Sequence, residues 1–71
     1  MNFKIQPRSE RSREIGIWRA KIRVLRDGKF VRATLDAPEF NRRADALAHA
    51  RVKATEIVAE LRANGTEAVA G

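Results

Sequence analysis

The sequence lacks cysteine and contains a single histidine, and both scarcities exclude particular kinds of chemistry. Without cysteine the chain has no disulfide bond, no thiolate metal site and no thiol nucleophile, so its core must be held by packing alone. One histidine, His49, makes no metal site by itself, and its place one helical turn after Asp45 favours a simple side-chain contact. Ser9 and Ser12 lie in a polar segment far from any plausible base. We therefore expect no enzyme, no cofactor and no small-molecule substrate.

The sequence also lacks a long apolar run. No stretch approaches the roughly 20 apolar residues of a membrane span, and residues 1–13 have no apolar block of the signal-peptide kind. We expect a cytoplasmic protein without membrane contact. A chain of 71 residues forms one domain, expected at 1–65, followed by a disordered tail at 66–71. So short a chain buries little of its surface, which leaves a homodimer open.

Positive charge is abundant and unevenly distributed. The formal net charge is +6, and residues 1–36 carry ten Lys and Arg against four Asp and Glu, whereas residues 37–71 carry five of each. Because the excess is confined to one half, the chain presents a directional field that attracts polyanions.

A β-hairpin is predicted from Ile15 to Leu35. Asp27 and Gly28 suit a two-residue type I′ turn, in which both positions need positive φ, and alternating runs flank them. Pairing about this turn gives one apolar face, formed by the pairs Val24–Val31, Ile22–Ala33 and Ala20–Leu35. It gives a largely basic second face, formed by the pairs Leu25–Phe30, Arg23–Arg32 and Lys21–Thr34.

A further strand is predicted before the hairpin, at Asn2–Gln6, where apolar and polar residues alternate. The segment Pro7–Glu14 has no apolar residue, and we expect it to be a mobile connection whose arginines hang beside the sheet.

A helix is predicted from Asn41 to Ala63. Its apolar stripe consists of Leu47, Ala50, Ala54, Ile57, Val58 and Leu61. Its solvent side consists of Asp45, His49, Glu56 and Glu60. Asn41 is the favoured N-cap, with Phe40 tucked under the helix start, although Asp36 and Glu39 could instead form a capping box. Asn64 and Gly65 end the helix.

The predicted fold is α+β, a three-stranded antiparallel sheet packed on one C-terminal helix (β-β-β-α). Such a sheet buries only one face under one helix. The residues expected to meet the helix are Phe3, Ile5, Trp18, Ala20, Ile22, Val24, Val31, Ala33 and Leu35.

The opposite face of the sheet stays open to solvent and is the predicted functional surface. Its basic side chains would contact nucleic-acid phosphates, and Phe30 could stack on an unpaired base. The predicted pair of Arg23 and Arg32 is the strongest indication of an anionic partner, because like charges facing each other across strands are destabilising unless an anion covers them. The predicted nucleic-acid contacts are Lys4, Arg19, Lys21, Arg23, Phe30 and Arg32. The alternative is a solvated face whose long basic side chains cover apolar surface beneath them.

A second hypothesis is a protein-interaction module. Ile17, Leu25 and Phe30 point outward without predicted cover, and they or an unpaired sheet edge could contact a second copy or an acidic protein. Scattered exposed apolar residues are also common on monomers. A stable dimer that buries the open face would favour this hypothesis.

A family resemblance is carried by three features of the sequence. They are residues 16–24 (GIWRAKIRV), the Asp27-Gly28 turn, and Phe40 followed by Ala44-Asp45-Ala46. Over roughly residues 15–50 the chain resembles the arm-site-binding domains of phage-type tyrosine recombinases, which are similar to the plant ethylene-responsive-factor domain. The resemblance implies a three-stranded sheet, backed by one helix, that enters the DNA major groove. It also implies that Arg19, Lys21, Arg23 and Arg32 meet DNA. The chain departs from the pattern where arginines replace the threonine that often caps the helix.

Overall fold

The computed structural model describes residues 2–71 and has an α+β fold with one helix and one sheet. The elements in chain order are β1 (Asn2–Arg11), β2 (Trp18–Arg26), β3 (Lys29–Phe40), α1 (Arg43–Ala63) and β4 (Glu67–Ala70). The sheet order is β3-β2-β1-β4, with antiparallel pairing except between β1 and β4, which are parallel. The α+β class is confirmed, but the prediction of three antiparallel strands is wrong, because a fourth strand makes the sheet mixed.

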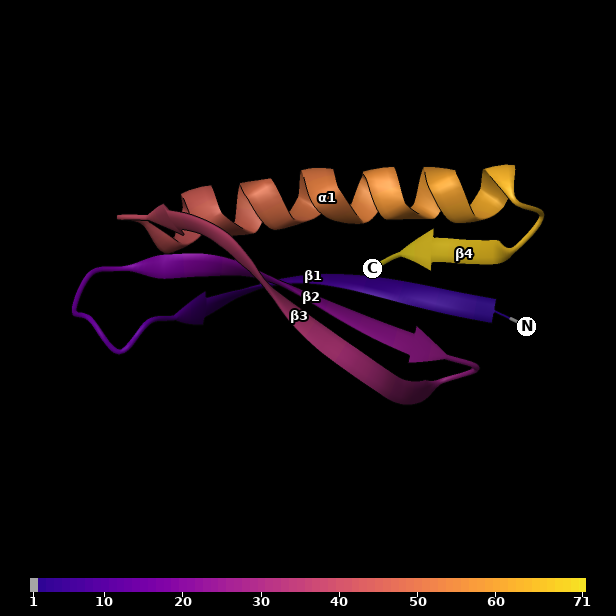
Figure 1. Ribbon diagram of the computed structural model, residues 1–71, viewed down its shortest axis with the longest axis horizontal. Coiled ribbons are helices and arrows are strands. Elements are labelled where there is room, and N and C mark those ends of the chain that lie inside the picture. The colour runs from indigo at the N-terminus through magenta and orange to yellow at the C-terminus, as the bar shows by residue number, and fades with distance from the viewer. Residues whose placement is uncertain (1) are drawn as a thin grey trace.

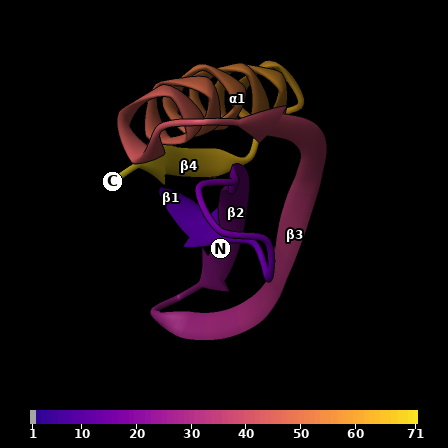
Figure 2. The same cartoon turned by 90° about the vertical axis from the view of Figure 1, so that its left-hand side faces the viewer.

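The helix and the sheet form two layers (Figure 1). α1 runs along the length of the molecule, above β4 and β1, and also packs on β2. β3 curves away along the far edge of the sheet and comes near the helix only where the chain leaves the strand (Figure 2). The sheet therefore has a side that faces α1, here called the helix side, and a side that no element within residues 2–71 covers.

The core lies where α1 meets β1, β2 and β4. Its buried members are Ile5, Ala20, Ile22, Ala50, Ala54, Val58 and Ala68, with Phe3, Val24, Ile57 and Leu61 packed against them. Ala46, Ala50 and Ala54 are fully buried at four-residue spacing, so the helix backbone comes close to the sheet. The predicted helix stripe is confirmed at Ala50, Ala54 and Val58, whereas the buried Ala46 was not predicted.

β1 is longer than predicted, because it continues from Gln6 through Pro7 to Arg11. The expected mobile connection at Pro7–Glu14 is therefore wrong for residues 7–11, which belong to β1. Proline is tolerated here because its missing N–H lies on an unpaired edge. The backbone N–H of Gly71 donates to the carbonyl oxygen of Ile5 at 3.0 Å, so alternate residues such as Ile5 and Pro7 direct their backbone groups toward β4. β4 pairs only as far as Ile5 and ends before Pro7.

The turn between β2 and β3 is the predicted one. Asp27 has φ 50° and Gly28 has φ 82°, as a type I′ turn requires. Asp27 also joins the turn to β1, because its N–H donates to the Asn2 carbonyl at 2.8 Å and its carboxylate accepts from the Asn2 N–H at 2.9 Å.

The predicted register between β2 and β3 holds only for the two pairs next to this turn. From Arg32 to Leu35, β3 is displaced by one residue, so that Val24 lies opposite Arg32 and Arg23 lies opposite Ala33. Val31 is the extra residue of a β-bulge at this point. A second irregularity, between Arg19 and Lys21, displaces the end of β3 further, so that Arg19 lies opposite Glu39. A shift of one residue exchanges the two faces of a strand.

The exchange overturns the predicted burial of β3. Val31 and Leu35, expected under the helix, are 54% and 42% exposed, and Ala33 is exposed as well. Arg32 and Thr34 occupy the helix side instead. Because α1 lies over the other strands, an apolar side chain there would gain little burial, and polar side chains are tolerated.

The start of the helix differs from the prediction. α1 begins at Arg43, and Arg42 is its N-cap, without a side-chain capping hydrogen bond, so Asn41 is not the cap. Phe40 is still part of β3, where it pairs with the half-buried Trp18 on the helix side.

No helix within residues 2–71 is both long and apolar enough to cross a membrane.

His49 is half-buried and not on the solvent side of the helix. Its Nε2 lies 2.6 Å from Oδ2 of Asp36, and its ring centroid lies 5.3 Å from that of Phe40. The predicted contact with Asp45 is therefore replaced by a link from α1 to β3.

The end of the helix is the predicted one. Gly65 has φ 81°, its N–H donates to the Arg62 carbonyl, and the Thr66 N–H donates to the Leu61 carbonyl. This is the Schellman arrangement, and it reverses the chain beneath the helix.

The segment after this turn is β4, and the predicted disordered tail at 66–71 is wrong. Glu67–Ala70 pairs in parallel with Asn2–Ile5, and Ala68 is only 2% exposed. The chain gains this order because Gly65 directs it back along an unpaired edge of β1, where Ala68 completes the core.

Candidate nucleic-acid interface

The side of the sheet that faces away from α1 gathers basic side chains. Pairs such as Lys4–Leu25 and Gln6–Arg23 place alternate residues of β1 and β2 on this side. We call it the open face, and on β1 and β2 its residues are Lys4, Gln6, Arg8, Glu10, Arg19, Lys21, Arg23 and Leu25. All of them are exposed or half-buried.

The predicted contact residues share this face with one exception. The open face holds Lys4, Arg19, Lys21, Arg23 and Phe30. Arg32 lies on the helix side, in a groove that it lines together with Val24 and Ile57. The predicted cross-strand pair of Arg23 and Arg32 is wrong, because the bulge at Val31 places Ala33 opposite Arg23. The two like charges are thus separated by the sheet itself.

Two basic side chains of the open face are paired with carboxylates. Lys21 Nζ lies 3.1 Å from Glu10 Oε1, and an Arg19 guanidinium nitrogen lies 3.4 Å from Glu39 Oε1. The four side chains are 32–49% exposed. Ion pairs this exposed contribute less than about 1 kcal/mol each, so they open readily.

Lys4, Arg8 and Arg23 form no ion pair within the described chain. The Arg23 guanidinium lies over the Phe30 ring, 5.5 Å from its centroid, in a cation–π contact. This contact holds Arg23 on the open face, while Phe30 remains 52% exposed.

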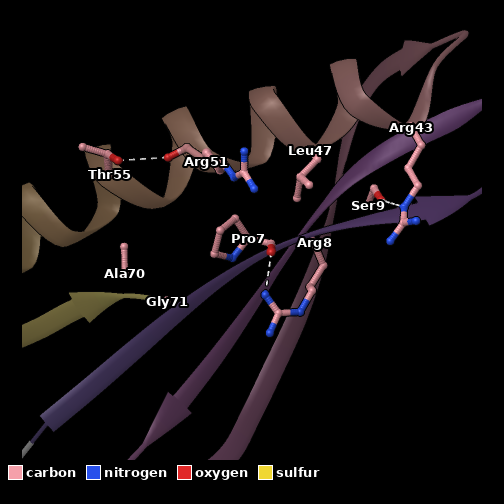
Figure 3. Close-up of a pocket in the computed structure, with 9 residues that line it drawn as sticks. All are labelled: Pro7, Arg8, Ser9, Arg43, Leu47, Arg51, Thr55, Ala70 and Gly71. Atoms are coloured by element: carbon pink, nitrogen blue, oxygen red, sulfur yellow. Dashed lines mark hydrogen bonds between the residues drawn. The ribbon is translucent and has the colours of Figure 1, made fainter.

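A groove adjoins the open face along the half of β1 that β4 leaves unpaired (Figure 3). Its volume is about 530 Å³, and its lining residues are Pro7, Arg8, Ser9, Arg43, Leu47, Arg51, Thr55, Ala70 and Gly71. We call it the arginine groove, because Arg8, Arg43 and Arg51 line it and none of these lining residues has an acidic side chain.

Local hydrogen bonds position two of these arginines, Arg8 and Arg43. Arg8 donates to the Pro7 carbonyl oxygen at 2.7 Å, and Arg43 Nε donates to Ser9 Oγ at 3.3 Å. Arg43 and Arg51 are eight residues apart, with Leu47 midway, so the helix presents them on one side. Arg43 and Arg51 were not predicted as site residues. Their spacing is visible in the sequence, but the spacing does not show which side of the helix borders the unpaired edge of the sheet.

The predicted partner contacts are only partly brought together. Leu25 and Phe30 pair across β2 and β3, and Leu25 is half-buried. Ile17 lies apart, half-buried in the loop before β2. Ile15, which is 90% exposed, was not singled out by the sequence.

No cluster of three or more His, Cys, Asp or Glu side chains that could hold a metal ion occurs in residues 2–71. His49 and Asp36 pair with each other and so tie α1 to β3.

No protein-family model, curated protein or solved structure matches this chain. The resemblance to arm-site-binding domains therefore stays a prediction, and the role of the open face rests on its own geometry.

Proposed function

We propose that this protein binds nucleic acid, largely through phosphate groups, on the open face and along the adjoining arginine groove. One observation carries the proposal, namely that these two surfaces share a set of cations with no carboxylate partner in the described chain. They are Lys4, Arg8, Arg23, Arg43 and Arg51.

Arg8 links the two surfaces, because it belongs to the open face by its position in β1 and also lines the groove. The positive charge therefore continues from the sheet around the free edge of β1 to α1. Guanidinium groups suit phosphate oxygens because their planar N–H groups form paired hydrogen bonds.

The ion-paired cations add to this surface when a polyanion is present. Lys21 and Arg19 can exchange Glu10 and Glu39 for phosphate oxygens, since exposed ion pairs open at small cost. Phe30 offers an exposed ring on which an unpaired base can stack.

Fluorescence anisotropy with a short labelled DNA duplex, and with single-stranded RNA of the same length, tests the proposal. We expect the logarithm of the binding constant to fall linearly with the logarithm of salt concentration. The slope for duplex DNA is about −0.9 per neutralised phosphate. Binding that is absent, or that does not change with salt, contradicts the proposal.

A pair of matched variants tests the site. Arg8→Gln with Arg23→Gln should reduce the magnitude of the duplex slope by about 1.8, because two phosphate contacts are lost. Arg26→Gln with Lys53→Gln removes the same charge outside both surfaces and should change the slope little. Equal effects of the two variants would mean that net charge alone drives binding, and would contradict the proposed site.

A further inference from the structure

Within residues 2–71, the outer edge of β3 is unpaired. β3 has 12 residues and is the last strand on its side of the sheet, so within residues 2–71 only β2 pairs with it. Phe30, Val31 and Leu35 on it are 42–54% exposed. Figure 2 shows β3 arching around the outside of the molecule, away from α1 for most of its length. A long edge strand with exposed apolar side chains is a template for pairing with another strand.

The backbone groups of β3 that are free to pair can be identified from the ladder. The pair that flanks a two-residue turn is hydrogen-bonded, and hydrogen-bonded pairs then recur at every second residue of β2. Arg32 and Thr34, which oppose Val24 and Ile22, therefore bond to β2. Ala33 and Leu35 alternate with them and direct their N–H and C=O groups outward.

The charges along β3 are self-complementary in the antiparallel direction. Its first half carries Lys29 and Arg32, and its second half carries Asp36 and Glu39. A two-fold axis at Thr34 places Arg32 of one copy opposite Asp36 of the other, because the two residues are equidistant from it. The same axis places Ala33 opposite Leu35, and these are the residues with outward backbone groups.

We propose that two copies of this chain associate by antiparallel pairing of β3 with β3, centred on Thr34. Arg32 and Asp36 both lie on the helix side, as the facing members of such a pair must. Asp36 uses Oδ2 for His49, which leaves Oδ1 to accept from the second copy's Arg32. The two sheets become one, with both helices on one side and the two open faces continuous on the other. This pairing does not depend on nucleic-acid binding.

The other sheet edges suit a second copy less well. The free half of β1 contains Pro7, which lacks the outward N–H, and the like-charged Arg8, Arg43 and Arg51 border it. β4 offers only four residues. Strand length and charge complementarity therefore both select β3.

Sedimentation velocity and light scattering over a concentration series that reaches about 1 mM test the association. We expect a reversible dimer. Ala33→Pro removes an outward N–H without touching a bond to β2, and it should weaken the dimer at least about tenfold. Ala70→Pro is the matched control, since the Ala70 N–H points outward from β4 at the other edge of the sheet. The dimer affinity of this variant should equal that of the original chain.

A charge exchange tests the register. Arg32→Glu alone and Asp36→Lys alone each set like charges against each other, and both variants should be monomeric at concentrations where the original chain is dimeric. Mixing the two variants restores opposite charges at both contacts and should restore a dimer.

Circular dichroism shows whether each variant is folded. A monomer throughout the concentration series overturns the inference. So does a dimer that survives Ala33→Pro, because this variant retains every bond between β2 and β3. A dimer that Ala70→Pro disrupts instead would place the contact at β4 and would equally overturn it.

Discussion

Few side chains of any size are fully buried in this protein. Among the described residues Ile5, at 1% exposure, is the largest side chain of that kind, and alanines fill most of the remaining contact between α1 and the sheet. The alanines allow close approach but contribute little apolar area, so burial energy is concentrated in Ile5, Ile22 and Val58. His49 adds a polar link from α1 to the uncovered strand β3.

Ile5→Ala should therefore be severely destabilising. The free energy of unfolding should fall by about 2–5 kcal/mol, because apolar area is removed and a cavity is left behind. That is a large part of the stability of a small domain, which lies toward the low end of about 5–15 kcal/mol. Val52→Ala is the control, because Val52 is 58% exposed on α1 and should change stability by less than about 0.5 kcal/mol. Urea unfolding measures both, and similar losses would contradict this description of the core.

Among the strands, β3 is the irregular one, with register shifts at Val31 and between Arg19 and Lys21. The bulge at Val31 separates two pairs next to the turn from a stretch displaced by one residue. It thereby decides that Arg32 and Asp36 face the helix side while Ala33 and Leu35 share the open face.

Deleting Val31 should remove the bulge and leave every other side chain of β3 on its present face. The shortened strand would run without interruption from the Leu25–Phe30 pair to the Val24–Arg32 pair. We expect the variant to fold, with stability changed by less than about 1 kcal/mol, because Val31 is exposed. NMR should retain the cross-strand contact between Arg23 and Ala33, and a contact between Arg23 and Arg32 would contradict the register. Deletion of Ile22, from the central strand β2, is the control and should abolish folding.

In the molecule as a whole, the apolar core and the basic open face lie on opposite sides of the sheet. The apolar core lies under α1. The open face carries five basic side chains beside the apolar Leu25, Phe30 and Leu35, and two of the five, Lys21 and Arg19, are paired with Glu10 and Glu39. These two glutamates reduce the positive potential of the proposed interface.

Glu10→Gln combined with Glu39→Gln should strengthen nucleic-acid binding. Releasing two cations should steepen the salt slope for duplex DNA by up to about 0.9 for each additional phosphate contact. Stability should fall by no more than about 1 kcal/mol per lost ion pair. Glu56→Gln with Glu60→Gln, on the exposed side of α1, makes the same charge change and should leave the slope nearly unaltered. Equal steepening in both variants would contradict a local role for Glu10 and Glu39.

Local patterns were sufficient for much of this protein. The Asp27-Gly28 turn, the helix stripe through Ala50, Ala54 and Val58, and the helix end at Gly65 were all predicted from the sequence. Each depends on residues close together in the chain, through turn conformation, helical periodicity or capping. The basic face of β2, with Lys4 of β1 beside it, was predicted for the same reason, since strand alternation fixes it. Arg8 was instead expected in a mobile connection, because the extension of β1 beyond Gln6 was not predicted.

The remaining features were decided by contacts between distant segments. A bulge changes the register without altering the alternation on either side of it, so the sequence did not reveal that Arg32 leaves the open face. β4 was missed because four residues carry too little pattern, and the free edge of β1 that orders them comes from the opposite end of the chain. The arginine groove exists only because β4 stops at Ala70 while β1 runs on beside Arg43 and Arg51. The sequence by itself thus determined the turn, the helix and the sign of the charge, whereas long-range strand pairing determined which charges lie together.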